Sequence, residues 1–218
     1  MIEAVLWDLD GTLISTRRLY LEAYRRALAP YIGRDMPDEE ILAQRARSEI
    51  RFLRAQAADH YDACLRDFRR HYADLHASHF GGIYPGVVET LEELRRRGAK
   101  LGVVTGKSRN SYDVTRVTAD IGPFDVLVMD DDVDEPKPHP QGMLIALAKL
   151  SVEPRSTLYI GDSLSDIHAA SAAGIAPVGA LWSKQGERRA QFAKAVAAEG
   201  AIVAEAPADV LDLMAARS

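Results

Sequence analysis

The feature that most constrains this chain is a short apolar run that ends in two carboxylates. Residues Ala4 to Trp7 are apolar and are followed directly by Asp8-Leu9-Asp10-Gly11-Thr12. A short apolar run bounded by a turn signal predicts a buried strand. Ligands of open α/β sheets bind at the carboxyl ends of the strands. Because two acids this close repel each other, the pattern indicates that a cation lies beside Asp8 and Asp10.

The rest of the chain predicts an α/β protein with a helical insertion. Residues 16–83 show helical periodicity, and their basic side chains include twelve arginines and no lysine. From residue 84 onward, apolar β-branched runs alternate with amphipathic segments, which is typical of a parallel sheet covered by helices on both faces. We therefore expect a catalytic core formed by residues 1–15 and 84–218, and an inserted helical domain formed by residues 16–83.

The periodicity and the start and stop signals also predict individual elements. In the insertion, we expect one helix to end near Pro30, a second to start at Pro37 with a break near Ser48, and a third to run from Asp59 to Phe80. Further strands are expected at 100–105, 124–129, 157–160, 176–180 and 202–203, and further helices at 87–97, 108–120, 139–150, 164–173, 187–199 and 208–216.

Composition restricts the environment and the partners of the protein. The chain has 218 residues, of which 47% are hydrophobic and 27% are charged, as in ordinary soluble globular proteins. Its net charge of −5 argues against a general nucleic-acid surface, and its apolar runs are too short to span a membrane. Cys64 is the only cysteine, and no signal peptide is visible. We expect a cytoplasmic monomer or homodimer that binds neither nucleic acid nor membranes.

Three further stretches follow predicted strands, so the fold would bring them to the same edge of the sheet as Asp8 and Asp10. They are Thr105-Gly106-Lys107, Pro136-Lys137-Pro138 and the segment 161–166, which contains Asp162 and Asp166. A hydroxyl and a glycine at a helix start can bind an anion, and prolines fix the backbone from which a lysine is aimed. Each stretch alone could be an ordinary turn or helix cap.

Together these residues predict phosphoryl chemistry. Carboxylates without cysteine or histidine partners suit Mg²⁺, which also accepts a phosphate oxygen of the substrate. A lysine neutralises charge on a transferring phosphoryl group. One carboxylate can act as a nucleophile, and a second one nearby can move protons.

The four motifs, in this order and with the helical insertion after the first, resemble the haloacid dehalogenase-like hydrolase superfamily, in its phosphatase branch with a helical cap. The resemblance covers nearly the whole chain. It implies a Rossmann-like parallel sheet of strand order 3-2-1-4-5 with an extra edge strand. It also implies that Asp8 attacks phosphorus to form an aspartyl-phosphate, and that Asp10 protonates the leaving alcohol and later activates water.

The resemblance assigns roles to the remaining motifs as well. It implies that Thr105 and Lys137 hold the phosphoryl oxygens, with Gly106 beside them. It implies that Mg²⁺ is bound by Asp8, by Asp162 and by the backbone carbonyl of Asp10, and that Asp166 orients Lys137 or metal-bound water. The substrate is then chosen by the cap, and the candidate residues are Arg45, Arg47 and Arg51. Apart from the resemblance, we expect Asp130-Asp131-Asp132 to form a solvated loop rather than a second metal site.

Within this family the pattern is similar to phosphoglycolate phosphatase and to relatives that hydrolyse small phosphate esters or pyrophosphate. The chain departs from that pattern at Gly106, where many members have asparagine, and at Ser15-Thr16, where many have an acid. Asp10 argues against a dehalogenase, since halide needs no proton. Hexose-phosphate mutases of this branch often have a histidine near the cap hinge, where this chain has Tyr20. They also often have two consecutive acids where this chain has Gly161-Asp162, and both differences argue against a mutase. We therefore expect Mg²⁺-dependent hydrolysis of a small phosphate monoester. The alternatives are a sugar-phosphate phosphomutase and, less favoured, a non-catalytic binding or regulatory protein.

Overall fold

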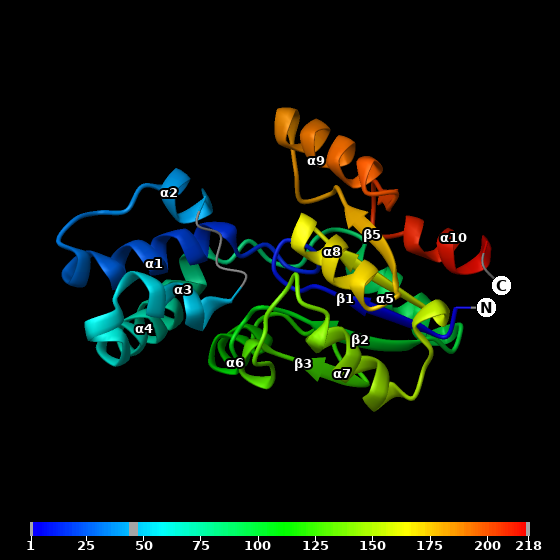
Figure 1. Ribbon diagram of the computed structural model, residues 1–218, viewed down its shortest axis with the longest axis horizontal. Helices are drawn as coiled ribbons and strands as arrows, with labels where there is room; N and C mark the ends of the chain where they lie inside the picture. The colour runs from blue at the N-terminus through cyan, green and yellow to red at the C-terminus, as the bar shows by residue number, and fades with distance from the viewer. Residues whose placement is uncertain (1, 44–47, 217–218) are drawn as a thin grey trace.

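The computed structural model describes residues 2–43 and 48–216 and shows a six-stranded sheet beside a group of helices (Figure 1). The strands are parallel, as the sequence pattern predicted, and lie in the order β3-β2-β1-β4-β5-β6, as the family resemblance implied. The central strand pairs with a neighbour on each side, so that Trp7 lies level with Val103 and Ile160. The strands are β1 (Ala4–Trp7), β2 (Lys100–Val104), β3 (Val126–Val128), β4 (Thr157–Gly161), β5 (Ala176–Ala180) and β6 (Ile202–Ala204).

Helices cover both faces of the sheet. Successive residues of a strand point to opposite faces, and because the strands are largely apolar, both faces carry apolar side chains that the helices bury. Val5 and Trp7 belong to an apolar cluster that includes residues of α5 (Val87–Arg96) and α10 (Asp209–Ala216). Ala4 and Leu6 belong to a second cluster, with residues of α7 (Gln141–Leu150) and α8 (Leu164–Ala172). Two more helices are α6 (Arg109–Arg116) and α9 (Gly186–Ala198), and three short 3₁₀ turns are Ala58–His60, Asp130–Asp132 and Pro154–Ser156. The central strand is therefore fully buried, as its apolar sequence predicts.

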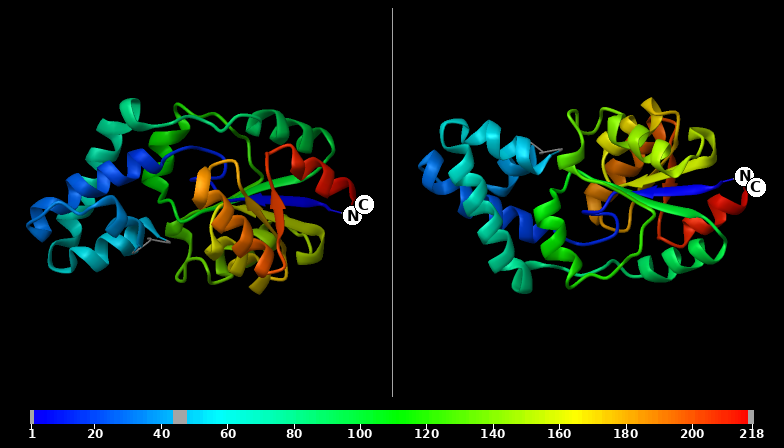
Figure 2. Two further views of the ribbon diagram at one scale, coloured as in Figure 1. Left: turned by 90° about the horizontal axis from the view of Figure 1, so that it is seen from above. Right: turned by 90° about the horizontal axis from the view of Figure 1, so that it is seen from below.

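The remaining helices form what we call the helical lobe, which consists of α1 (Arg17–Ile32), α2 (Asp38–Ala43), α3 (Glu49–Gln56) and α4 (Tyr61–His79). The lobe has an apolar cluster of its own, in which the rings of Tyr24 and Phe68 stack with centroids 4.8 Å apart. It lies beyond the carboxyl edge of the sheet (Figure 2). Among the described residues, no helix is both long and apolar enough to cross a bilayer.

The two connections between the lobe and the sheet run side by side. The Ser15 N–H donates to the Gly82 carbonyl at 2.9 Å, and the Gly81 N–H donates to the Ser15 carbonyl at 2.8 Å. Gly81 suits this crossing, because a Cβ there would lie 2.6 Å from Ser15 Oγ. The expected domain boundaries, at 15/16 and 83/84, fall within this crossing, and the division into two domains stays a prediction.

Some helix boundaries differ from those predicted. The first helix continues through Pro30 to Ile32, and it ends at Gly33, whose φ of 71° lets its N–H cap the Ala29 carbonyl. A proline in the last turn removes one hydrogen bond without ending the helix there. The helix expected at 108–120 stops at Arg116, and the helix expected from 139 begins at Gln141, with Pro140 as its N-cap residue.

Candidate active site

The turn after β1 fixes the two leading carboxylates. The Asp8 N–H continues the sheet by donating to the Ile160 carbonyl at 2.8 Å. Beyond it the chain folds back sharply, and the N–H groups of residues 12–14 all donate to the Leu9 carbonyl. Gly11 has a φ of 89°, and a Cβ there would lie 2.7 Å from a carboxylate oxygen of Asp162. Glycine is therefore needed for both the turn and the close approach to Asp162.

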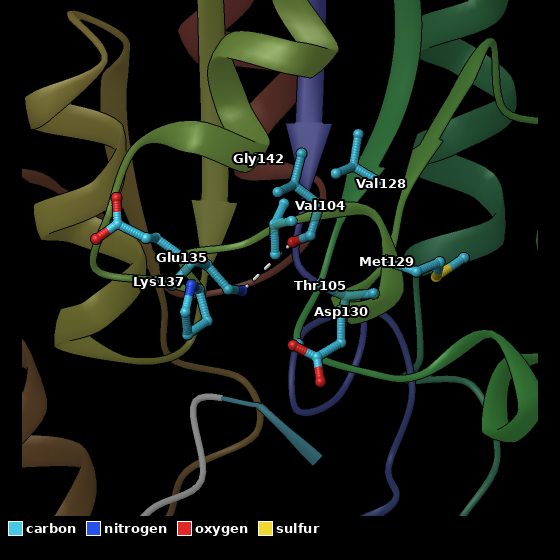
Figure 3. Close-up of a pocket in the computed structure, with 11 residues that line it drawn as sticks. Val104, Thr105, Val128, Met129, Asp130, Glu135, Lys137 and Gly142 are labelled. Carbon is cyan, nitrogen blue, oxygen red and sulfur yellow. Dashed lines mark hydrogen bonds between the residues drawn. The ribbon is translucent and has the colours of Figure 1, made fainter. Parts of the chain in front are cut away.

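Lys137 lies at the centre of the site. Its ammonium donates to Asp8 Oδ1 at 2.8 Å and to Asp166 Oδ1 at 2.6 Å. It also contacts the Tyr159 hydroxyl at 3.0 Å and the Val104 carbonyl at 3.3 Å, the second of which is dashed in Figure 3. Burial opposes the charged ammonium, but the attraction of Asp166 and Asp8 outweighs it and raises the pKa of Lys137 well above its usual value. Lys137 is therefore a cation fixed beside the expected nucleophile.

Asp166 performs two tasks at once. Its Oδ2 accepts from the N–H of Ser163 at 3.0 Å and from the Ser163 hydroxyl at 2.6 Å, which caps α8. Its Oδ1 accepts from Lys137 and from Tyr159, at 2.6 and 3.1 Å. Burial raises the pKa of Asp166, but the charge and hydrogen bond of Lys137 outweigh it and hold that pKa below its usual range. The helix cap thereby also orients the lysine.

The carboxylates of Asp8, Asp162 and Asp166 form a group that fits a hard divalent cation. Each offers an oxygen within 4.8 Å of the others. Burial, with the charges of Asp166 and Asp162, raises the pKa of Asp8 to about 7 against the opposing effect of Lys137. A cation among these oxygens would favour the ionised form. The carboxylate of Asp10 does not belong to this group, and the expected metal contact of Asp10 is through its backbone carbonyl.

The residues after β2 lie beside Lys137. Thr105, Gly106 and Lys137 line one small hollow at the carboxyl edge of the sheet (Figure 3). The Thr105 hydroxyl accepts from the N–H of Lys107 at 3.3 Å, while the Gly106 carbonyl accepts from the N–H of Glu49 in the lobe at 3.2 Å. The structure thus brings together Asp8, Lys137, Asp162 and Asp166, with Thr105 and Gly106 beside them.

Asp10 has partners that the sequence did not reveal. Its Oδ1 accepts from the Thr16 hydroxyl at 2.7 Å and from the Lys107 ammonium at 3.0 Å. The same ammonium contacts the hydroxyls of Tyr20 and Tyr72, at 2.9 and 2.7 Å. Burial opposes its charge, but the attraction of Asp10 outweighs it and raises the pKa of Lys107 above its usual value. The position of Lys107 directly after Thr105-Gly106 was the one available signal in the sequence.

Lys184 is a second cation that the sequence patterns did not indicate. Its ammonium donates to Asp162 Oδ2 at 2.7 Å, from the loop that follows β5. Nearby, the Trp182 indole N–H donates to the Thr12 carbonyl at 2.7 Å, which ties this loop to the turn after β1. The loop after β5 therefore also contributes to the site.

The candidate arginines of the insertion have different positions. Arg45 and Arg47 lie outside the described residues. Arg51 binds the loop that leads to Lys137: its guanidinium donates to Asp130 Oδ1 at 2.9 Å, to the Val133 carbonyl at 3.0 Å and to the Asp134 carbonyl. These three contacts join the lobe to the sheet, while a fourth, to the Ser48 hydroxyl at 3.2 Å, lies within the lobe, and the role of Arg51 in substrate binding stays a prediction.

The expectation that residues 130–132 form a solvated loop was wrong for Asp130. This side chain is buried, and it accepts from the Ser48 hydroxyl at 2.6 Å and from the Ile50 N–H at 3.3 Å in addition to Arg51. Burial raises its pKa above the usual value, against these hydrogen bonds. The lobe covers Asp130, a long-range contact that the local sequence does not indicate.

Comparisons with known proteins agree with this geometry. Residues 5–180 match the family described as haloacid dehalogenase-like hydrolase. The pyrophosphatase PpaX of Bacillus pumilus is 36% identical over 190 residues, which cover 85% of this chain and 86% of that protein.

Two solved structures share the fold over nearly their whole length. A protein of Lactobacillus plantarum, provisionally named a phosphoglycolate phosphatase, has a TM-score of 0.80 at 27% identity and covers 98% of this chain and 99% of its own. The phosphate complex of CbbY from Rhodobacter sphaeroides has a TM-score of 0.78 at 28% identity, with 96% of each chain covered. The chain therefore belongs to the haloacid dehalogenase-like hydrolases, and it is a phosphatase-type enzyme of that family.

Proposed function

We propose that this enzyme hydrolyses small-molecule phosphate monoesters with Mg²⁺ as cofactor and Asp8 as nucleophile. The observation that carries the proposal is the 2.8 Å contact between Asp8 and Lys137, made where the carboxylates of Asp162 and Asp166 converge. A nucleophilic carboxylate beside a fixed cation, with further acids for a metal ion, is the arrangement that phosphoryl transfer requires.

The residues divide the reaction into two steps. In the first, an oxygen of Asp8 forms a bond to phosphorus while the bond from phosphorus to the leaving oxygen breaks, and Asp10 gives that oxygen a proton. In the second, Asp10 takes a proton from water, which attacks the aspartyl-phosphate and releases inorganic phosphate. Lys137 and Thr105 hold the phosphoryl oxygens, and Asp166 keeps Lys137 in place through the 2.6 Å contact.

Mg²⁺ would be held by the carboxylates of Asp8 and Asp162 and by the backbone carbonyl of Asp10. The bound ion supplies positive charge that favours the ionised form of Asp8 and offsets the negative charge of the phosphoryl group. Such charge would matter for Asp8, because burial raises the pKa of this carboxyl group and a protonated carboxyl group is a poor nucleophile.

The substrate class is a small phosphate compound. The relatives named above are a pyrophosphatase and a protein provisionally named a phosphoglycolate phosphatase, which supports a panel built around these two chemistries. A screen with Mg²⁺, scored by phosphate release, should therefore include phosphoglycolate, sugar phosphates, nucleotides and pyrophosphate. Product analysis of each turned-over sugar phosphate separates hydrolysis from isomerisation.

The first prediction concerns Asp8. The substitution Asp8→Asn removes the nucleophile, so we expect phosphate release to fall by at least about a thousandfold, and we expect EDTA to abolish the activity of the unmodified enzyme. The control is Asp113→Asn, which changes an exposed carboxylate that pairs with Arg116 on α6. Full activity in Asp8→Asn would exclude the proposed nucleophile.

A further inference from the structure

Lys107 is a buried cation between the sheet and the helical lobe. It lies in the turn after β2, two residues beyond Thr105, yet its side chain is fully buried and its ammonium reaches Asp10 at 3.0 Å. Its other two partners come from the lobe: Tyr20 lies on α1 and Tyr72 on α4, with hydroxyls at 2.9 and 2.7 Å. An ammonium has three N–H donors, and these three partner residues account for them, with the shorter of the two Asp10 contacts made to Oδ1.

The tyrosine hydroxyls are themselves fixed by further hydrogen bonds. Tyr20 donates to Glu49 Oε2 at 2.9 Å, and the other oxygen of Glu49 accepts from the Ser108 hydroxyl. The Thr115 hydroxyl donates to the Ser111 carbonyl at 3.0 Å, so in its 2.9 Å contact with Tyr72 it must be the acceptor. Each tyrosine hydroxyl therefore accepts a hydrogen bond from Lys107 and donates its own hydrogen to Glu49 or to Thr115. These partners fix the directions of the hydrogen bonds around the ammonium.

The two oxygens of Asp10 are held unequally. Oδ1 accepts from both Thr16 and Lys107, at 2.7 and 3.0 Å. Among the described residues, Oδ2 accepts one longer contact, from Lys107 at 3.3 Å. The Asp10 side chain keeps 22% of its surface exposed, although the side chain of Lys107 is fully buried. Oδ1 is thus anchored, and Oδ2 is the oxygen that remains available for proton exchange.

We propose that Lys107 is the positioning residue for Asp10, and that the lobe sets this position through Tyr20 and Tyr72. With Thr16, Lys107 holds Oδ1 so that Oδ2 faces the leaving oxygen in the first step and water in the second. The inference rests on the proposed function, in which Asp10 moves these protons. A purely structural contact between lobe and sheet would need no bond to a partly exposed catalytic carboxylate.

The experiment compares two substrates of the intact enzyme with Mg²⁺. One is an alkyl phosphate, whose leaving oxygen needs a proton, and the other is 2,4-dinitrophenyl phosphate, whose leaving oxygen does not. The measured quantity is kcat/KM, which reports the transfer of the phosphoryl group to Asp8. The variants are Lys107→Met and Tyr72→Phe. The control is Tyr24→Phe, which removes a hydroxyl from the same aromatic cluster where no contact with Lys107 is described.

We expect Lys107→Met to lower kcat/KM for the alkyl phosphate by roughly a hundredfold, and to lower it for the dinitrophenyl ester by about threefold or less. Tyr72→Phe removes one hydrogen bond to the ammonium, so a loss of roughly threefold to tenfold is expected for the alkyl phosphate alone. When Asp10→Asn is already present, Lys107→Met should lower kcat/KM for the alkyl phosphate by less than about a further twofold. The reason is that both substitutions impair proton transfer by the same group, Asp10.

Three results would overturn the inference: equal losses for the two substrates, an undiminished effect of Lys107→Met in the Asp10→Asn background, or equal effects of Tyr24→Phe and Tyr72→Phe. If Lys107→Met does not fold, as thermal unfolding would show, the tyrosine variants decide the question. Activity that survives in Asp8→Asn would instead refute the proposed function, whatever the pattern with leaving groups.

Discussion

At the scale of single residues, the site depends on close packing as well as on charge, and Gly11 shows this. A methyl group at Gly11 would lie 2.7 Å from Oδ2 and 2.8 Å from Cγ of Asp162. We predict that Gly11→Ala displaces Asp162, so that the Mg²⁺ concentration needed for half-maximal activity rises by roughly tenfold or more. Titration of phosphate release with Mg²⁺ measures this shift.

The control for Gly11→Ala is Gly33→Ala. Both glycines have a positive φ, 89° and 71°, but at Gly33 no described atom beyond the adjoining residues lies within 4 Å of the position that a Cβ would take. Both substitutions should therefore lower the free energy of unfolding by about 1 kcal/mol through backbone strain, whereas the Mg²⁺ requirement should change in Gly11→Ala alone. An equal Mg²⁺ requirement in the two variants would contradict the prediction.

Single residues also show how far a sequence can predict a site. The convergence of Asp8, Lys137 and Asp166 was predictable, because the carboxyl ends of parallel strands meet at one edge of the sheet. The stretch that contains Lys107 was expected at this edge, but the burial of Lys107 and the contact of Lys184 with Asp162 were not predictable in this way. Their partners come from distant segments, and a lysine in a sequence carries no sign that it will be buried.

At the scale of elements, the start of α3 is attached to the loop that leads to Lys137. Asp130 is buried and pairs with Arg51, which is partly exposed. We predict that Arg51→Met leaves this carboxylate without a cation and lowers the free energy of unfolding at pH 7 by about 1–3 kcal/mol. Urea unfolding followed by circular dichroism measures the change.

The pH dependence of this effect has a definite sign. Burial already raises the pKa of Asp130 in the folded state, so the folded protein binds a proton at this carboxylate more tightly than the unfolded chain does. Protonation of Asp130 therefore stabilises the folded state at low pH, and this stabilisation is lost as the pH rises. Loss of Arg51 raises that pKa further, so Arg51→Met should cost less stability at pH 5 than at pH 7. The control is Arg54→Met, on the same helix as Arg51, which removes a guanidinium 4.4 Å from the centre of the Tyr61 ring of α4. If Arg51→Met instead raises KM with unchanged stability, the arginine binds substrate.

Element types were easier to predict than element ends. The strands follow from apolar runs whose neighbours are turn residues, and the central strand was predicted to the residue. The ends of helices depend on tertiary contacts and capping. Pro30 lies inside a helix because Gly33 provides the cap, and Asp130 is buried because the lobe covers it.

At the scale of the whole molecule, polar contacts link the apolar cluster of the lobe to the part of the protein that holds the apolar clusters of the sheet. The lobe buries its aromatic residues within itself, and the sheet buries its own apolar residues between its helices. Between them lie buried polar groups such as Lys107, Glu49 and Asp130. Such groups are sensitive to geometry, since a displaced partner leaves a buried charge unsatisfied. The placement of the lobe should therefore affect activity more than it affects the stability of the sheet.

The crossing of the two connections offers a test of this idea. In Gly81→Ala the new methyl group would lie 2.6 Å from Ser15 Oγ and 3.0 Å from the Ser15 carbonyl oxygen, so the two connections must move apart. We predict a fall in kcat on the order of tenfold to a hundredfold, because a shifted lobe moves Tyr20 and Tyr72 away from Lys107. Steady-state kinetics measure the fall, and small-angle scattering reports the position of the lobe.

The matched control is the neighbouring residue. Gly82→Ala strains a backbone with a φ of 84°, yet in the part of the chain that the structure describes no atom beyond the adjoining residues lies within 4 Å of the added methyl group, so the connections can stay together. We expect it to cost about 1 kcal/mol of stability and to leave kcat within about twofold. The decisive comparison is between the falls in kcat of the two variants. If Gly82→Ala lowers kcat as much as Gly81→Ala does, backbone strain in the connection causes the loss. The spacing of the two segments would then not set the position of the lobe.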